Sequence, residues 1–216
     1  GLVFVLLLKL TMADAQTYSS IPLPEPHTDG GVSVEQALAQ RHSVRDYSRG
    51  PLTLEQLGQL LWAAQGTTHA GTRRTAPSAG ALYPLELYAI VGNVRELEEG
   101  VYHYAPDRHA LRRGSNQDKR AALSQAAWAQ HAIASAPVIV VIAGVEARTA
   151  AKYGRRAARY VYMEAGHVGQ NLYLQAAALD LGTVSIGAFS DNAVRRLLDL
   201  SSGERPLYLF PVGHPQ

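Results

Sequence analysis

Two arginines and a serine alternate in the segment Arg41-His42-Ser43-Val44-Arg45. A guanidinium forms charge-assisted and often bidentate hydrogen bonds with phosphate oxygens, and a serine hydroxyl adds a directional donor. The segment is therefore suited to bind a phosphate dianion. Most arginine-rich pentapeptides are solvated surface, however, so the spacing alone leaves both interpretations open.

Glu164 and His167 are three residues apart within a helical pattern. Carboxylate di-iron bundles use this spacing but need two copies of it, and the chain has one. We therefore expect a buried structural hydrogen bond here and predict no metal site. The cysteine count of 0 excludes disulfides, thiolate nucleophiles, zinc–cysteine sites and iron–sulfur clusters. Redox chemistry would thus need a bound cofactor.

Several common catalytic and nucleotide-binding motifs are missing. The chain has no Gly-x-Ser-x-Gly, so Ser43 is not predicted to be a hydrolase nucleophile. It also has no Gly-x-Gly-x-x-Gly and no Gly-x-x-x-x-Gly-Lys-Ser/Thr, which argues against a built-in nicotinamide site and a P-loop. The 20 Lys+Arg against 18 Asp+Glu are scattered, so no nucleic-acid partner is expected.

The 216 residues suffice for one domain with one core. We expect that domain over residues 33–216, after an apolar segment and an extended Pro- and Gly-rich surface arm in residues 1–32. The apolar run Leu2–Leu8 is too short for a stable membrane span, but Ala13-Asp14-Ala15 has the form of a signal-peptidase site. The protein is expected to be cytoplasmic, or exported if residues 1–15 are the remnant of a signal peptide. Met12 could equally be the true start.

Two short helices are predicted on either side of the Arg41–Arg45 segment. Ser33 opens the first with a capping box, ending near Arg41, and Thr53 opens the second, which runs to Gly66. Val34, Ala37 and Leu38 are expected to form the buried stripe of the first helix.

The remaining pattern favours an α+β fold, because it shows no regular alternation of strands and helices. Residues 66–84 are predicted to be a long structured loop. A helical pattern over residues 149–181, apolar on all sides, is expected to break near Gly154 or Gly166. Further helices are predicted over 118–130 and from Asp191, and strands over 85–91, in a hairpin over 100–111, in the buried run 138–142, and over 183–186 and 207–210.

Seven segments match a known family in their order along the chain, namely 41–45, 60–66, 74–86, 100–104, 152–154, 164–172 and 182–189. Together they resemble the flavin-dependent nitroreductase-like superfamily, and within it the azoline (thiazoline/oxazoline) dehydrogenase-like branch that acts in the biosynthesis of thiazole/oxazole-modified peptides. The resemblance covers about residues 30–216. It implies a central mixed, mostly antiparallel sheet flanked by helices, an intertwined homodimer, and FMN at the dimer interface.

The resemblance also implies roles for individual residues. Arg41 and Ser43, with His42 between them, would hold the FMN phosphate, and Arg45 would reach the ribityl chain and the N1/O2 edge of the ring. A cation at that edge would raise the reduction potential. Pro77-Ser78-Ala79-Gly80 would approach the flavin from the partner subunit. Ser185-Ile186-Gly187-Ala188 would line one ring face, with the Gly187 N–H directed at N5.

Lys152 and Tyr153 match the Lys-Tyr pair to which catalysis is attributed in azoline dehydrogenases. A lysine desolvated in a cleft can take the proton that accompanies hydride loss from an azoline. The alternative is a surface pair at a helix. Many nitroreductases have Asn and Gln at the positions of Ala81 and Tyr83; the azoline-dehydrogenase-like branch also lacks them, which favours that branch. Many nitroreductases also place a C-terminal Lys or Arg on the phosphate. This chain has no basic residue after Arg205, so we expect phosphate contacts beyond those named above.

The resemblance thus predicts an FMN-dependent oxidoreductase that transfers hydride through N5 of the flavin and acts on a small-molecule or peptide-heterocycle substrate. One alternative is a nitroaromatic or quinone reductase that uses NAD(P)H as a transient co-substrate. Another is a flavin- or ligand-binding protein without turnover.

Overall fold

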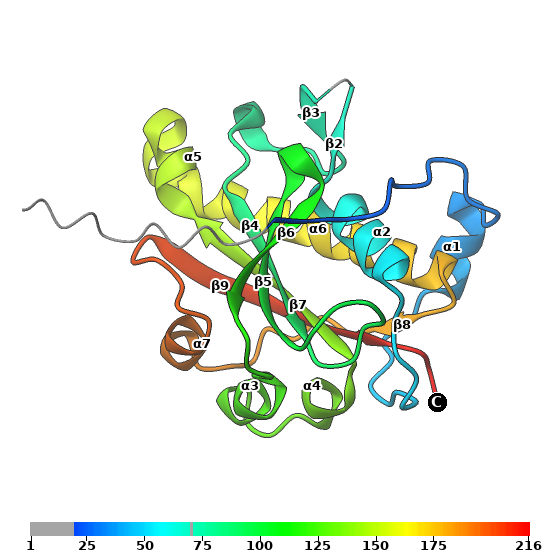
Figure 1. Ribbon diagram of the computed structural model, residues 1–216. Helices are drawn as coiled ribbons and strands as arrows, with labels where there is room; N and C mark the ends of the chain where they lie inside the picture. Colours follow the sequence, from blue (N-terminus) through cyan, green and yellow to red (C-terminus); the bar gives the residue numbers. More distant parts are fainter. Residues whose placement is uncertain (1–19, 70) are drawn as a thin grey trace, which may run out of the picture.

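A seven-stranded antiparallel sheet forms the centre of the computed structural model, which describes residues 20–69 and 71–216 (Figure 1). The apolar run, Met12 and the signal-like Ala13–Ala15 lie outside the described residues. The strand order is β1 (Ser20–Pro22), β6 (Ala110–Ser115), β5 (Gly100–Ala105), β4 (Leu85–Val91), β7 (Val138–Val145), β9 (Glu204–Gly213) and β8 (Gly182–Thr183).

All the strand pairs of this sheet are antiparallel. Parallel pairing occurs in isolated bridges, from Ser43 to Thr183 and from Leu52 to Val94. The expected α+β class with a mostly antiparallel sheet is confirmed. The predicted central strand is β7, whose side chains enter two different cores because successive residues point to opposite faces.

Helices cover both faces of the sheet. Val140 and Ile142 of β7 pack into the core that contains α2 (Leu54–Gln65) and α6 (Ala157–Ala178). Ile139 and Val141 face the second core, which is built with α3 (Arg120–Ala126), α4 (His131–Ser135) and α7 (Asp191–Leu197). α1 (Val34–Gln40) packs on α6.

Both capping boxes are present, at Ser33 and Thr53, but the buried stripe predicted for α1 is wrong. Only Ala37 is buried, whereas Val34 is 64% exposed and Leu38 50% exposed. The physical reason is that this short peripheral helix meets α6 through one small residue. Its two larger apolar side chains remain on the surface.

The long helical pattern breaks at Gly154, where φ is +50°, and continues through Gly166. It therefore forms α5 (Glu146–Tyr153), a 3-10 turn (Gly154–Arg156) and α6. The expectation of a helix apolar on all sides is wrong, because Tyr162 and Met163 of α6 are about half exposed. Only one face of α6 packs on the sheet.

The loops differ in detail from the predictions. Residues 66–84 contain a hairpin of β2 (Thr67–Thr68) and β3 (Arg73–Arg74) and a 3-10 turn (Ala79–Ala81). A further 3-10 turn (Pro106–Arg108) joins β5 to β6. The arm before α1 is not purely superficial, since Ser20–Pro22 pairs with β6 and Leu23 is buried. β8 stops at Thr183, and Ile186 forms only an isolated bridge with Leu209.

Candidate active site

Tyr173 on α6 joins two of the predicted cofactor-binding segments. Its hydroxyl oxygen lies 3.0 Å from the Ser43 Oγ and accepts a hydrogen bond of 2.9 Å from the backbone N–H of Ser185. The Ser185 Oγ is 3.4 Å from the same oxygen. The Arg41 guanidinium stands 5.3 Å from the centre of the Tyr173 ring. Four residues from three parts of the chain therefore meet at one point.

The backbone brings these segments together. The chain leaves α1 at Arg41 in an extended conformation, and the Val44 N–H then donates to the Thr183 carbonyl at 2.9 Å. Ser43 consequently lies beside Thr183 of β8, and Thr183 is two residues before Ser185 in the chain. This parallel pairing of short, non-consecutive segments has no periodic signal in the sequence.

The environment of Tyr173 favours ionisation of its hydroxyl. Burial opposes ionisation, but the hydrogen bonds from Ser185 and Ser43 and the positive charge of Arg41 outweigh it, so that the pKa of Tyr173 is lowered. Sequence reasoning missed Tyr173, because a tyrosine in a helix with an apolar stripe reads as core packing. Its hydroxyl is suited to position the two serines.

A cavity of about 300 Å³ lies next to this point and is lined by Arg41, His42, Tyr173 and Thr183, among others. The His42 Nδ1 is 3.0 Å from the Gln40 carbonyl. Within residues 20–69 and 71–216, neither Arg41 nor Arg45 forms an ion pair, so their charges are available to an anion. Arg45 is exposed.

The Ser185–Ala188 turn is held by its second residue. Ile186 is buried and exchanges two backbone hydrogen bonds of 2.9 Å with Leu209 of β9. Ser185, Gly187 and Ala188 are left exposed. Gly187 also borders a cavity of about 380 Å³ whose lining includes Tyr162, Arg205 and Tyr208. A planar ring can thus approach the backbone of this turn.

A second group of predicted site residues forms elsewhere. Gly80 has a φ of +65°, and a Cβ added to it would lie 3.0 Å from the Tyr153 hydroxyl and 3.2 Å from the Lys152 Nζ. The left-handed backbone therefore favours glycine here, and a larger residue would displace the ends of the Lys152 and Tyr153 side chains by a few tenths of an ångström. In the same loop, the Ser78 Oγ accepts a hydrogen bond of 2.9 Å from the Tyr83 N–H. The Pro77–Gly80 segment thus lies directly against Lys152 and Tyr153.

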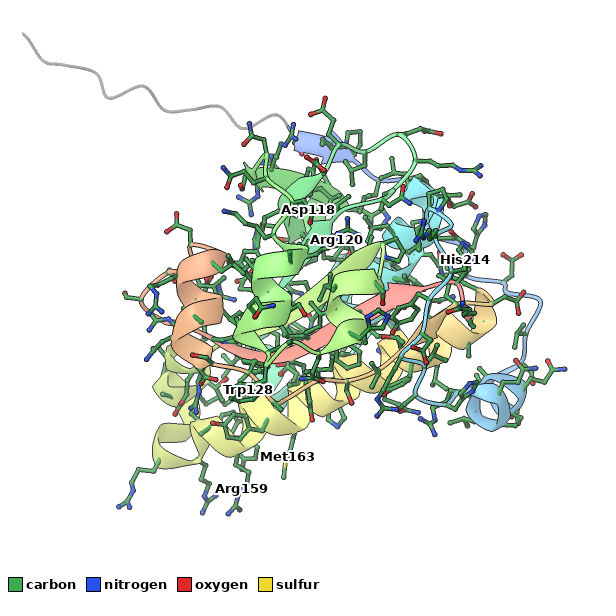
Figure 2. The ribbon with its side chains drawn as sticks, turned by 90° about the horizontal axis from the view of Figure 1, so that it is seen from below. Asp118, Arg120, Trp128, Arg159, Met163 and His214 are labelled. Atoms are coloured by element: carbon green, nitrogen blue, oxygen red, sulfur yellow. The ribbon has the colours of Figure 1, made fainter. Side chains whose placement is uncertain are left out.

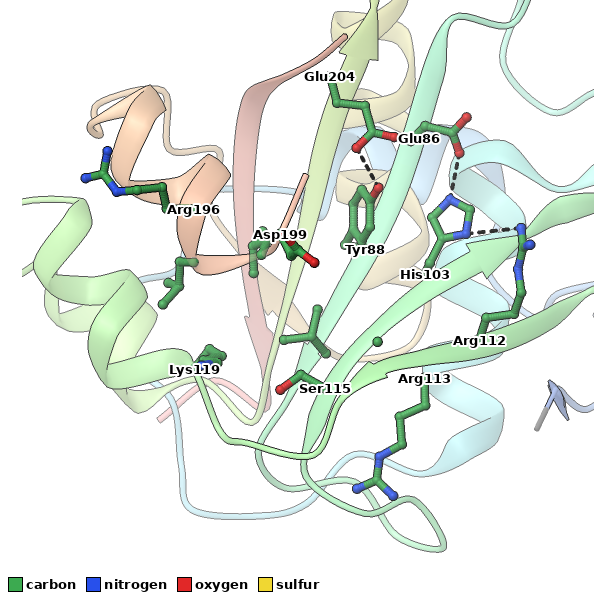
Figure 3. A pocket seen from close by; sticks show the side chains of 14 residues that line it. Glu86, Tyr88, His103, Arg112, Arg113, Ser115, Lys119, Arg196, Asp199 and Glu204 are labelled. Carbon is green, nitrogen blue, oxygen red and sulfur yellow. Dashed lines mark hydrogen bonds and ion pairs between the residues drawn. The ribbon is translucent and has the colours of Figure 1, made fainter. Parts of the chain in front are cut away.

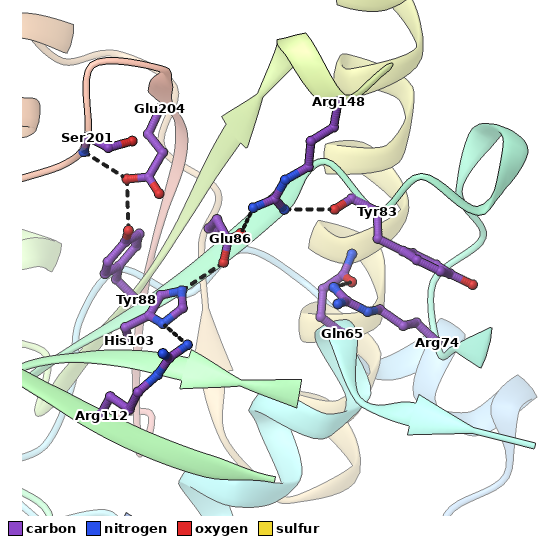
Figure 4. Close-up of polar contacts among 10 residues, drawn as sticks. All are labelled: Gln65, Arg74, Tyr83, Glu86, Tyr88, His103, Arg112, Arg148, Ser201 and Glu204. Atoms are coloured by element: carbon purple, nitrogen blue, oxygen red, sulfur yellow. Dashed lines mark hydrogen bonds and ion pairs between the residues drawn. The ribbon is translucent and has the colours of Figure 1, made fainter. Parts of the chain in front are cut away.

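Polar contacts fix α5, and with it Lys152, to this loop. The Val145 N–H donates to the Pro84 carbonyl at 2.7 Å. Arg148 donates to the Tyr83 carbonyl at 3.1 Å and forms an ion pair with Glu86 (Figure 4). Lys152 itself is exposed in the single chain. The desolvation expected of a lysine base is therefore not provided by the chain's own packing.

Glu86 connects α5 to an open face of the sheet. Its second carboxylate oxygen is 2.7 Å from the His103 Nε2. Burial raises the pKa of Glu86, but His103 and Arg148 outweigh it and the pKa is lowered. Figure 3 shows the adjoining cavity of about 650 Å³, where the Tyr88 hydroxyl donates to Glu204 at 2.8 Å. None of the predicted site residues lines it.

Glu164 is buried, as expected for a structural residue, with 2% of its surface exposed. The Gln65 Nε2 lies 3.5 Å from its carboxylate, and Arg74 donates to Gln65 at 2.9 Å. Burial raises the pKa of Glu164, although hydrogen bonds from Ser78 and Gln65 oppose the shift. The predicted structural hydrogen bond is confirmed for Glu164, whereas His167 is exposed and takes no part in it. The described residues contain no cluster of three or more His, Asp or Glu suited to a metal ion.

The structure does not bring the two groups of site residues to each other within one chain. Along α6, Glu164 contacts Ser78 of the second group, and Tyr173 contacts Ser43 and Ser185 of the first. Nine residues of α helix separate these positions by about 13 Å. The phosphate and ring-face segments thus form one group, and Pro77–Gly80 forms another with Lys152 and Tyr153.

Comparison with known proteins shows the same architecture elsewhere. Residues 38–214 match the model of the Nitroreductase family. Putative nitroreductase MJ1384 of Methanocaldococcus jannaschii is 48% identical over 182 residues, which cover 84% of this chain and 91% of that protein. The crystal structure of a putative nitroreductase from Ralstonia eutropha superposes with a TM-score of 0.79 at 27% identity, covering 91% of this chain and 90% of the other.

Two more distant structures share the fold. The E. coli microcin synthetase McbBCD complex has a TM-score of 0.70 at 21% identity, with 99% of this chain and 85% of that chain covered. The NADPH:FMN oxidoreductase from Vibrio harveyi, complexed with NAD+, has a TM-score of 0.63 at 21% identity, with 85% and 69% covered.

The antiparallel sheet with a layer of helices on each face is the architecture of the nitroreductase-like fold. The chain belongs to the nitroreductase family, and it is an oxidoreductase of that family. None of the helices in residues 20–69 and 71–216 combines the length and the apolar character needed to cross a membrane.

Proposed function

We propose that the protein is an FMN-dependent oxidoreductase that removes a hydride from a heterocyclic substrate through N5 of the flavin, in the manner of an azoline dehydrogenase. The observation that carries the proposal is the meeting of Arg41, Ser43 and Ser185 at Tyr173. It unites the segment suited to a phosphate with the turn suited to a flat ring.

The donor set fits FMN. Arg41 and Ser43, beside His42 and a cavity of about 300 Å³, would hold the phosphate. Arg45, which is exposed and without an ion pair in the described part of the chain, would reach the ribityl chain and the N1/O2 edge. The Ser185–Ala188 turn would support one face of the ring. When bound, FMN supplies a two-electron acceptor that the side chains lack.

The separation of the two groups along α6 supports a homodimeric site. Pro77–Gly80 and Lys152–Tyr153 of one copy would face the phosphate and ring segments of a second copy. The exposed apolar side chains of Val34, Leu38 and Met163 on α1 and α6 fit such an interface. The second copy would also cover Lys152 and remove water from it.

Lys152 is proposed as the base of the dehydrogenation. The substrate carbon would lose a hydride to the flavin while the neighbouring carbon loses a proton to the Lys152 amine, and a double bond forms between the two carbons. Tyr153 would orient that amine, because its ring centre lies 5.7 Å from the Lys152 Nζ. The substrate is a small heterocycle or a heterocycle within a peptide.

A second candidate is the reduction of nitroaromatics or quinones with NAD(P)H as a transient co-substrate. The relative at 48% identity, which is named as a nitroreductase, favours it. A third is flavin or ligand binding without turnover, in which the Lys152-Tyr153 pair has no catalytic role. The three candidates differ in what they require of the flavin.

Spectroscopy tests these candidates in order. A flavin absorbance that survives gel filtration supports both enzyme candidates, and a colourless protein that cannot be reconstituted with FMN overturns them. Anaerobic mixing with NADH or NADPH then sets the direction. Rapid bleaching favours the reductase, and no bleaching together with turnover of an azoline peptide favours the dehydrogenase.

Lys152→Ala tests the base. We expect loss of dehydrogenation by about 100-fold or more, with FMN still bound, because general-base catalysis typically contributes this much. Lys119→Ala is the control, since Lys119 lies on another surface at the start of α3 and contacts Gln117. Equal activity of the two variants removes Lys152 from the mechanism.

A further inference from the structure

The loop between α3 and α4 exposes an indole. Trp128 is 67% exposed, and both Trp128 and Ala129 adopt left-handed backbone conformations, with φ of +54° and +58°. Such conformations are uncommon outside glycine, and two in succession need support from the surrounding structure.

Hydrogen bonds within the loop provide that support. The Ala129 N–H donates to the Ser124 carbonyl at 2.8 Å, and the Trp128 N–H donates to the Gln125 carbonyl at 3.2 Å. The Ser124 side chain, which is buried, donates to the Gln130 carbonyl at 3.0 Å. These hydrogen bonds fix the backbone of the loop that carries Trp128.

The loop is also tied on both sides of Trp128 to the segment after Gly187. Two residues before it, the Ala126 carbonyl accepts a hydrogen bond of 2.8 Å from the Ser190 N–H. Two residues after it, the Gln130 Nε2 donates to the Ala188 carbonyl at 3.1 Å. Figure 2 shows Trp128 at the end of the α3–α4 layer. The loop that carries the exposed indole is thus held against the end of the Ser185–Ala188 turn.

We infer that Trp128 forms a wall of the substrate site above this turn and selects planar, conjugated substrates by stacking. The inference rests on the proposed function, because the turn is a substrate site only if a flavin ring lies on it. An indole presents a large flat face with few rotatable bonds, so it can stack on a planar ring at low entropic cost. The exposed indole of Trp128 is then available to stack on a substrate, which an indole packed in the core would not be.

Stacking predicts a loss of affinity confined to planar ligands. In protein loaded with FMN and reduced by dithionite, reoxidation by 1,4-naphthoquinone should require about 3- to 10-fold more quinone for half-saturation in Trp128→Ala, and much less extra in Trp128→Phe. The rate of reoxidation by ferricyanide, which has no planar ring to stack, should not change. Half-saturation at the wild-type quinone concentration in Trp128→Ala would overturn the inference.

Fluorescence gives a readout independent of turnover, because the chain has 2 tryptophans, Trp62 and Trp128. In Trp62→Phe the remaining emission comes from Trp128, and saturable quenching by 1,4-naphthoquinone is expected in the FMN-loaded protein. In Trp128→Phe the emission of Trp62 should show no saturable quenching. Equal quenching in both variants would overturn the inference. If the wild-type protein cannot be loaded with FMN, the proposed function fails and the inference with it, whereas failure in loaded protein affects the inference alone.

Discussion

Replacing Tyr173 by phenylalanine would remove one hydroxyl and keep the ring that packs on Phe210. The Ser185 N–H and the Ser43 Oγ would each lose a partner. One hydrogen bond contributes about 0.5–1.5 kcal/mol net, so two contribute about 1–3 kcal/mol. Ser43 and Ser185 are exposed and can bind water instead. We therefore expect a loss near the lower end, about 1–2 kcal/mol, or a fall in Tm of about 2–8 °C for a domain of this size.

The same change should weaken FMN binding. Without the Tyr173 hydroxyl, Ser43 and Ser185 are no longer held in register, and the ligand has to supply that order on binding. A cost of about 1–2 kcal/mol corresponds to a dissociation constant about 5- to 30-fold higher. Titration of apoprotein with FMN, followed by flavin fluorescence, measures this directly.

Tyr102→Phe is the matched control. Its ring is also buried, and its hydroxyl donates one hydrogen bond of 2.8 Å to the Glu98 carbonyl, away from the candidate site. The control should lower Tm but leave the FMN dissociation constant unchanged. If both variants bind FMN as tightly as the wild type, the organising role assigned to Tyr173 is refuted.

Two further predictions follow from Gly80 and Glu164. Gly80→Ala should destabilise the chain by about 1–2 kcal/mol because of its left-handed backbone, and it should also displace Lys152 and Tyr153 and lower turnover. Gly71→Ala is the control, since Gly71 has a φ of +85° but open space around it, and this change should lower stability without lowering turnover. Equal turnover in the two variants would contradict the close packing at Gly80. Burial raises the pKa of Glu164, so the stability that its protonated form contributes below the ordinary pKa of 4.5 is lost as the pH rises through the raised pKa. Glu164→Gln, which stays neutral, should therefore have a higher Tm than the wild type at pH 8 and the same Tm at pH 3. A lower Tm for Glu164→Gln at pH 8 would count against the pKa shift.

Strong local signals predicted much of the fold correctly. The capping boxes at Ser33 and Thr53 begin α1 and α2, and the continuous apolar run of β7 identifies a strand buried on both faces. Gly154 ends α5, as one of the two expected break positions. These features depend on residues close in sequence, which is why a single sequence is enough to find them.

Other features depend on contacts between distant segments. Val34 and Leu38 are exposed because only a small part of α1 contacts α6. The hydrophobic periodicity of the sequence does not predict how large that contact is. The arrangement of Ser43 and Ser185 depends on the hydroxyl of Tyr173, 130 residues after Ser43. The sequence therefore identifies the participants in the candidate site better than it predicts their partners.

The two outer strands of the sheet have a consequence for how copies of the chain can associate. At one margin, Pro22 of β1 has no N–H to donate, and Pro24 and Pro26 follow it. At the other margin, the Thr183 carbonyl of β8 already accepts the Val44 N–H. At Pro22 and at Thr183 the backbone therefore offers no free partner to a further strand, which opposes edge-to-edge pairing at these two positions. A homodimer of the kind proposed would then be built from side-chain contacts between helical surfaces rather than from an added strand.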